Sequence, residues 1–274
     1  MQHPQDPHHP QSAPSRHAAQ EGLAQDLAHW RTLPNRRGFS LQLLAGLCAA
    51  GSSAVARAAE MCSLIPSETA GPFPANGSGR GGRGVPNVLT LAGAVRSDLR
   101  RGIGAAQAVA QGVPLTLQLE LKRSAADCRP AAGMAVYLWH CDREGRYSLY
   151  APDLREQNYL RGVQVADAAG RVSFTTVFPG CYPGRMPHLH FEVYATLADA
   201  AAGRGRIVTS QIAFPNEASA RVYREAEGYA ASRPAFEQMS FARDMVFADG
   251  TELQMPALEG SPAAGFTARL AVGL

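Results

Sequence analysis

Two histidines, His188 and His190, stand two residues apart in a strand-like run, HLHFEVY, that ends at Tyr194. In a β-strand, residues i and i+2 point to the same face and lie roughly 7 Å apart. Two imidazoles on one face can bind one metal ion. A His-x-His pair on a strand is more often an ordinary polar face, so the metal interpretation depends on further donors nearby.

The chain uses histidine sparingly beyond its N-terminal segment. Of its 8 histidines, all but His140, His188 and His190 fall within roughly the first 30 residues. Two of the three remaining histidines therefore form the closely spaced pair, which favours a shared role for them.

Two tyrosines and an arginine are expected close to this pair, because they fall on adjoining predicted strands and turns. Tyr147 follows the predicted strand that ends at Trp139, Tyr182 lies just before the histidine strand, and Arg185 precedes His188 by three residues. Two phenolates with two neutral imidazoles suit a hard trivalent cation, above all Fe(III), better than Zn(II) or Cu(I). A free phenol titrates near pH 10, so only a strongly acidic metal would hold it ionised at neutral pH.

The elements that must position these residues are short strands separated by turns. We expect an all-β fold, a single-domain β-sandwich of mostly antiparallel strands with long loops and a short peripheral helix at 218–229. Turn signals such as Asp167-Ala168-Ala169-Gly170 separate the strands. The predicted strands cover 88–95, 115–121, 134–139, 171–177, 188–194 and 207–214.

The N-terminal segment has the features of an export signal. Arg36 and Arg37 precede a modest apolar stretch, and Ala56-Arg57-Ala58 provides the small residues that a signal peptidase needs. We therefore expect residues 1–58 to be a disordered leader with a twin-arginine-type signal, residues 59–274 to form the folded domain, and the protein to be periplasmic or extracellular. A soluble tail with a short buried helix is the alternative.

Composition and charge exclude several classes of partner. Hydrophobic residues make up 46% of the chain, enough for one sizeable core, and the formal net charge is +3. No basic run interleaved with aromatic residues indicates nucleic acid. Leu47, directly before Cys48, is not the small residue that lipid attachment requires, so we expect no membrane anchor.

Four cysteines follow the expected cleavage point. An even number in an exported chain indicates two disulfides with three possible connectivities. We favour Cys62–Cys128 and Cys141–Cys181, with buried free thiols as the alternative.

From about Cys62 to Asp249, the chain resembles the intradiol ring-cleavage dioxygenases, particularly exported relatives of the protocatechuate 3,4-dioxygenase catalytic subunit. The joint order of the motifs makes the resemblance specific, although each motif alone is weak. They are PSETAGPF at 66–73, VYLWHCD at 136–142, GRYS at 145–148, FPGCY at 178–182 and HLH at 188–190.

The resemblance implies roles for individual residues. It implies Fe(III) held by Tyr147, Tyr182, His188 and His190, with Tyr182 also taking a substrate proton. Arg185 matches the family's arginine that faces the reacting ring. Gln211 matches its glutamine behind the metal ligands, and the stretch 69–72 matches the segment that lies across the site.

The same resemblance implies a catechol-type substrate and O₂, with ring cleavage between the two hydroxyl-bearing carbons to a cis,cis-muconate-type product. Two departures leave the ring substituents and the oligomeric state open, a homo-oligomer included. Cys181 stands where many exported relatives carry an aromatic residue, and the helical dimerisation region of the catechol and hydroxyquinol branches is absent.

Two other classes of protein remain open from the sequence. An exported, non-enzymatic metal-binding β-sandwich would keep the histidine pair but would not need Tyr147, Tyr182 and Arg185 together. A copper or zinc enzyme built on the pair would want a third histidine or a carboxylate close by, and His140 is the only spare histidine after the leader.

Overall fold

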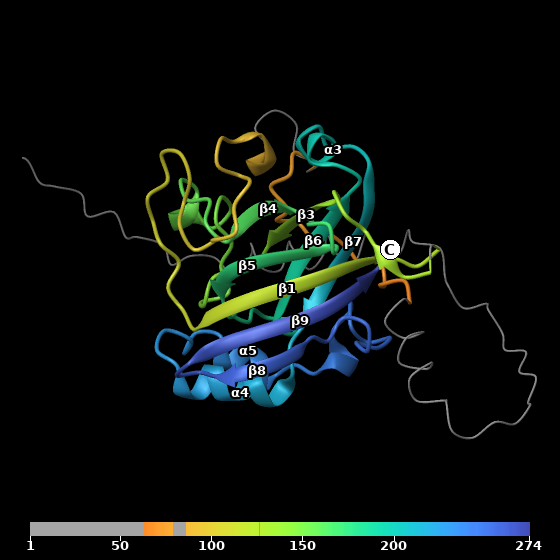
Figure 1. Cartoon of the computed structure of the whole chain (residues 1–274). Helices are drawn as coiled ribbons and strands as arrows, with labels where there is room; N and C mark the ends of the chain where they lie inside the picture. Colours follow the sequence, from red (N-terminus) through yellow and green to blue (C-terminus); the bar gives the residue numbers. More distant parts are fainter. Residues whose placement is uncertain (1–62, 79–85, 126) are drawn as a thin grey trace, which may run out of the picture.

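The computed structural model describes residues 63–78, 86–125 and 127–274. The predicted leader, its cleavage point and Cys62 lie outside these residues, so the division at residue 58 stays a prediction. Two β-sheets dominate the described chain (Figure 1), and the expected all-β sandwich is confirmed.

The first sheet has five strands. Its central strand β1 (Pro114–Arg123) pairs antiparallel with β5 (Arg171–Val177) and with the two-residue β2 (Arg129–Pro130). On its other side, β1 pairs in parallel with β9 (Gly265–Gly273), and β9 pairs antiparallel with β8 (Ala257–Ser261).

The second sheet has four antiparallel strands in the order β4-β3-β6-β7. They are β4 (Arg161–Val165), β3 (Ala135–Trp139), β6 (His188–Tyr194) and β7 (Arg206–Ala213). Trp139 is the register partner of His190 across β3 and β6, and Gln211 is its partner across β6 and β7.

The two faces of β6 have different roles. Leu189, Phe191 and Val193 point into the main core between the sheets, together with the alternate leucines of β1. The intervening residues, including both histidines, point to the opposite face of the sheet and are also buried. A second cluster of buried residues, from loops and from β3, covers that face, so the histidine face is a closed site and not a solvent-facing polar surface.

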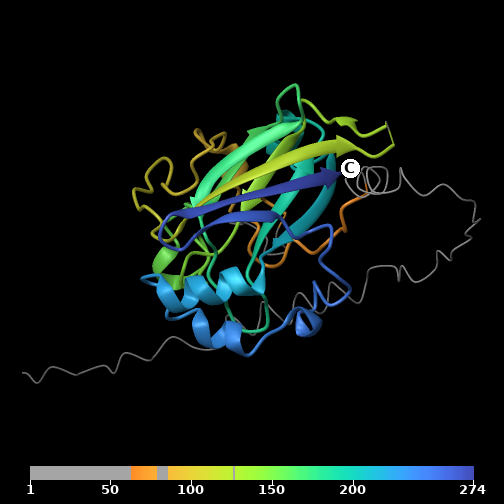
Figure 2. The same cartoon turned by 60° about the horizontal axis from the view of Figure 1, so that its bottom comes forward.

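Helices are short and peripheral. They are α3 (Leu197–Ala201), α4 (Asn216–Glu225) and α5 (Arg233–Glu237), with 3₁₀ turns η1 (Val88–Thr90), η2 (Pro152–Leu154) and η3 (Phe241–Arg243). Figure 2 shows α4 and α5 together at one end of the sheets. None of the helices in the described ranges is long and apolar enough to cross a membrane.

The strand predicted at 88–95 is wrong. The Asn87 side chain accepts a hydrogen bond from the Leu89 N–H and starts the η1 turn, and Gly93 then reverses the chain with φ of 89°. Such a positive φ favours glycine and does not fit a strand. The sequence-based prediction also missed β2, β4, β8 and β9.

The predicted Cys141–Cys181 disulfide is also wrong, because both cysteines are buried free thiols. The Cys141 Sγ donates to the Gly180 carbonyl at 3.5 Å and belongs to the cluster over the histidine face. The Cys181 Sγ donates to the Arg185 carbonyl at 3.3 Å and belongs to the main core. Cys128 is not a free thiol, but Cys62 lies outside the described residues, so the Cys62–Cys128 pair stays a prediction.

Candidate active site

The histidine pair forms the floor of the site. His188 and His190 are 1% and 3% exposed, and their Nε2 atoms are 3.1 Å apart. The Nδ1 of His188 lies 2.6 Å from the Met186 carbonyl, which can only accept a hydrogen bond. His188 therefore carries its proton on Nδ1 and turns the Nε2 lone pair toward His190, the tautomer that a metal ligand needs.

Both predicted tyrosines converge on this pair. The Tyr182 Oη lies 3.0 Å from the His188 Nε2, and the Tyr147 Oη lies 3.5 Å from the Tyr182 Oη. Two nitrogens and two oxygens thus meet within the span of a single ion. Tyr147 is buried, whereas Tyr182 is partly exposed and forms the open side of the cluster.

Two glycines allow the tyrosine-bearing turns to pack together. A Cβ on Gly145, where φ is 83°, would come 2.8 Å from the Cys181 carbonyl oxygen. A Cβ on Gly180 would meet the Asp142 carbonyl oxygen at 2.5 Å, and the Gly180 N–H donates to that oxygen at 3.0 Å. Close approach of these turns brings Tyr147 and Tyr182 side by side, so both glycines, to which the sequence motifs gave no role, are needed to position the two tyrosines.

The electrostatics of the cluster suit a strongly acidic cation. Burial, followed by the positive charge of Arg185, lowers the pKa of both histidines well below the usual value and keeps the imidazoles neutral. Burial, followed by the neighbouring Tyr182, raises the pKa of Tyr147 well above 10, so a phenolate there needs a metal to form. Across the described part of the chain, no group of three or more His, Cys, Asp or Glu side chains could hold a metal ion, so a metal at the pair would depend on the phenols.

Arg185 lies buried beside the pair. Its Nη2 donates to the Gln211 Oε1 at 2.6 Å, and the Gln211 Nε2 donates to the Thr69 carbonyl at 2.9 Å. The structure therefore brings all six sequence-predicted residues into one site and places Thr69, from the predicted covering segment, against it.

His140 does not join the cluster. Its Nδ1 lies 2.7 Å from the Cys141 carbonyl and its Nε2 lies 2.6 Å from the Thr176 Oγ1. Burial lowers the pKa of His140 to about 4, which keeps it neutral. The copper or zinc alternative therefore gains no third histidine from the described residues.

Two residues with no predicted role support the ligands. The Trp139 ring stacks on the His190 ring, with centroids 4.9 Å apart and planes 5° apart. Arg161, fully buried, donates to the Phe73 carbonyl at 2.7 Å and to the Ser148 Oγ at 3.0 Å, which ties the covering segment to the turn of Tyr147. The sequence did not reveal the contact of Trp139 because the contact depends on the register of β3 against β6, which pairs Trp139 with His190.

Comparisons with known proteins now bear on this geometry. A family sequence model described as Dioxygenase matches residues 103–221, a range that contains all six predicted site residues. An intradiol ring-cleavage dioxygenase from Tetranychus urticae has a similar structure, with 26% identity, a TM-score of 0.52, and coverage of 65% of this chain and 85% of that one. A second structure, of the dioxygenase Tetur07g02040, has 25% identity, a TM-score of 0.53 and the same coverage.

Over residues 103–221 and in its fold, the chain resembles the intradiol ring-cleavage dioxygenases. This likeness supports an oxidoreductase of the dioxygenase type, and members of that family act on catechol-type substrates with O₂.

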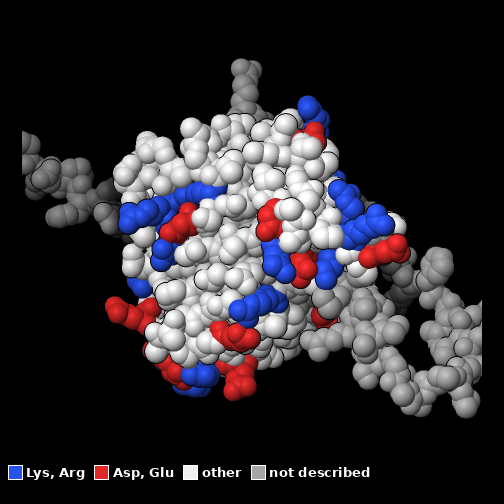
Figure 3. All heavy atoms as spheres, viewed as in Figure 1, with Lys and Arg blue, Asp and Glu red and all other residues white. Residues whose placement is uncertain are grey.

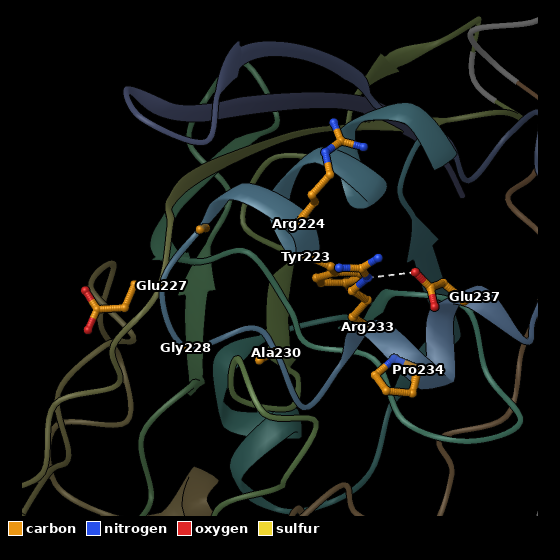
Figure 4. A pocket seen from close by; sticks show the side chains of 9 residues that line it. Tyr223, Arg224, Glu227, Gly228, Ala230, Arg233, Pro234 and Glu237 are labelled. Carbon is orange, nitrogen blue, oxygen red and sulfur yellow. Dashed lines mark hydrogen bonds and ion pairs between the residues drawn. The ribbon is translucent and has the colours of Figure 1, made fainter.

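One surface pocket of the protein is distinct from the site. It lies at α4 and α5 and is lined by Tyr223, Arg224, Arg233 and Glu237 among others, with Arg233 donating to the Glu237 Oε1 at 2.7 Å (Figure 4). None of the six site residues lines it.

On the face shown in Figure 3, Lys and Arg side chains are interspersed with Asp and Glu.

Glu68, directly before the covering segment 69–72, predicts a pH dependence of stability. Burial, with the negative charge of Asp249 second, raises the pKa of Glu68 from 4.5 to about 7. The folded chain then holds a proton that the unfolded chain releases near pH 4.5, so the free energy of unfolding falls as pH rises from 4.5 to 7. We expect this loss to be about 2 kcal/mol after allowing for the partial exposure of Glu68.

Glu68→Gln removes the titrating group and tests this directly. Compared with the parent, the variant should gain about 2 kcal/mol in relative stability between pH 4.5 and 7.5. Urea unfolding at several pH values measures the difference. Parallel stability curves for the two proteins over this range would contradict the expectation.

Proposed function

We propose that this chain is a non-haem Fe(III) dioxygenase that cleaves a catechol-type ring between its two hydroxyl-bearing carbons. Both atoms of O₂ would enter a cis,cis-muconate-type product. The single observation that supports this best is the convergence of two imidazole nitrogens and two phenol oxygens at 3.0–3.5 Å beside a buried arginine.

Tyr147, Tyr182, His188 and His190 would hold the ferric ion. The donor set fits, since phenolates are hard anionic ligands and both histidines are neutral. When bound, Fe(III) would be chelated by the catechol, would stabilise its dianion and would thereby activate the electron-rich ring for reaction with O₂.

The remaining steps of the proposal belong to the side chains. Tyr182, the more exposed phenol, would leave its position as the catechol enters and accept one of the substrate's protons on its Oη. Arg185 would stabilise the negative charge that develops at the ring during cleavage. Gln211, bonded to the Arg185 Nη2, would hold that guanidinium in place.

Oxygen consumption and isotope incorporation test this function. The iron-loaded protein, supplied with a panel of catechols, should consume one O₂ per ring cleaved. With ¹⁸O₂, mass spectrometry should find both labelled atoms in a ring-opened diacid. If the iron-loaded protein consumed no O₂ with any catechol of the panel, the proposal would be wrong.

Tyr182→Phe should separate metal binding from turnover. We expect the variant to keep much of its iron, because three protein ligands remain, and to cleave catechols roughly tenfold to a hundredfold more slowly, because the proton acceptor is lost. Tyr150→Phe is the matched control, because the Tyr150 Oη accepts from the Ala75 N–H at 2.9 Å and does not hydrogen-bond any of the four donor side chains. Equal rates for Tyr182→Phe and the parent would refute the proton-acceptor role.

The export of the protein is part of the same proposal. Arg36, Arg37 and the Ala56-Arg57-Ala58 sequence support a periplasmic or extracellular enzyme whose mature chain begins near Ala59. Replacing both arginines by lysine should retain the precursor inside the cell. Unchanged export of that variant would argue against the twin-arginine route.

A further inference from the structure

We infer that Asp244 is a positioning residue that orients both Arg185 and His188 for the reaction. This inference rests on the proposed ring cleavage. Asp244 lies outside the 103–221 segment that the family model matches and outside the sequence motifs described above. It is fully buried just after η3, in the part of the chain between α5 and β8.

The contact with Arg185 fixes the guanidinium. The Arg185 Nε donates to both carboxylate oxygens of Asp244 at 3.1 Å, and the Nη2 of the same guanidinium donates to Gln211. Two edges of one planar group are thus held from different elements. The ring of Phe247, three residues after Asp244, lies under the guanidinium with its centroid 5.7 Å from the Cζ. A guanidinium held in this way needs no reorientation as charge develops on the substrate.

The contact with the Met186 peptide extends the effect to a proposed metal ligand. The Met186 N–H donates to the Asp244 Oδ2 at 2.6 Å, and the carbonyl of the same residue lies 2.6 Å from the His188 Nδ1. Asp244 therefore anchors the backbone residue that sets the tautomer and ring direction of His188. The Asp244 carboxylate thus holds Arg185 directly and holds the His188 imidazole indirectly, through Met186.

The carboxylate itself is rigidly placed. Its Oδ1 also accepts from the Val246 N–H at 2.9 Å and from the Phe247 N–H at 3.4 Å. These backbone bonds leave Asp244 little freedom to rotate. The same density of hydrogen bonds means that a change at Asp244 will cost stability as well as rate, and the test must separate the two.

A double-mutant cycle between Asp244 and Arg185 makes this separation. In the parent, Asp244→Asn should lower kcat by about tenfold or more, while the KM for catechol changes by less than about threefold. In the Arg185→Ala background, the same change should lower kcat by less than about threefold, because no guanidinium is left to position and only the weaker, indirect support of His188 through Met186 is lost. A full Asp244→Asn effect on kcat in both backgrounds would overturn the inference.

Thermal unfolding of the metal-free proteins gives a readout that does not depend on activity. Asp244→Asn should lower Tm in the parent but raise it in the Arg185→Ala background, where it removes a buried carboxylate that has lost its cation. The same drop in Tm in both backgrounds would show that Asp244 does not act through Arg185. If the sign reversal were found but the iron-loaded parent cleaved no catechol, the proposed function would fail and the contact would stand.

Glu192→Gln is the matched control. Glu192 is also fully buried, but its hydrogen bonds come from Asn76, Tyr194, Arg206 and Thr209 and not from Arg185. We expect this variant to lose stability without a tenfold fall in kcat of the folded, iron-loaded enzyme. An equal fall in kcat for Glu192→Gln would show that the Asp244 effect reflects general loss of a buried carboxylate.

Discussion

His190→Ala should lose almost all bound iron, to less than about a tenth of the parent content, and with it all measurable ring cleavage. His190 donates one of the four converging atoms, and its ring is held between the stacked Trp139 and the partner imidazole of His188. A cation held by four protein atoms loses a large part of its binding free energy when one is removed. Elemental analysis of the purified variant measures the effect.

His140→Asn is the control for this variant. His140 is equally buried in the same sheet region but is bonded to Cys141 and Thr176 and lies apart from the donor cluster. It should keep near-parent iron per folded molecule. If His190→Ala kept its full iron content and the visible absorption of the parent, the metal would lie elsewhere in the chain.

Arg185→Ala should give the opposite combination, with nearly full iron and very slow turnover. A guanidinium has no lone pair to offer a metal, so the ligand set is unchanged. The loss of the positive charge facing the reacting ring should cost about a hundredfold or more in kcat, or about 3 kcal/mol of transition-state stabilisation.

Stopped-flow measurement of catechol cleavage, with iron determined on the same sample, tests Arg185→Ala. Arg206→Ala is a suitable control because the partly exposed Arg206 pairs with the buried Glu192 on the same sheet and not with any of the four donor side chains. Cleavage by Arg185→Ala at the parent rate would contradict the placement of Arg185 against the ring.

Much of the site could be predicted from the sequence because its residues follow local patterns. The alternation of HLHFEVY correctly predicted β6, with bounds at His188 and Tyr194, and the two-residue period placed both histidines on one face. Tyr182 and Arg185 lie within eight residues of that strand, so short-range spacing was enough to bring them near the pair.

The remaining features depend on contacts between distant segments. Asp244 reaches Arg185 across 59 positions, and the parallel pairing of β9 with β1 joins segments that are far apart in the sequence, so no local pattern shows either. The wrong Cys141–Cys181 disulfide has the same origin. The expected export of the chain and the even number of cysteines after the cleavage point favoured a disulfide. The two thiols, however, belong to different clusters of buried residues.

The visible absorption spectrum of the iron-loaded protein, before and after addition of a catechol, tests the central claim most directly. Tyr147 and Tyr182 bound to Fe(III) as phenolates should give a red charge-transfer band, and a catechol should shift it as it chelates the ion. Tyr147→Phe should weaken the resting band, whereas Tyr150→Phe should leave it unchanged. A colourless iron-loaded protein, or a band that catechol does not shift, would contradict a tyrosine-ligated ferric centre at this site.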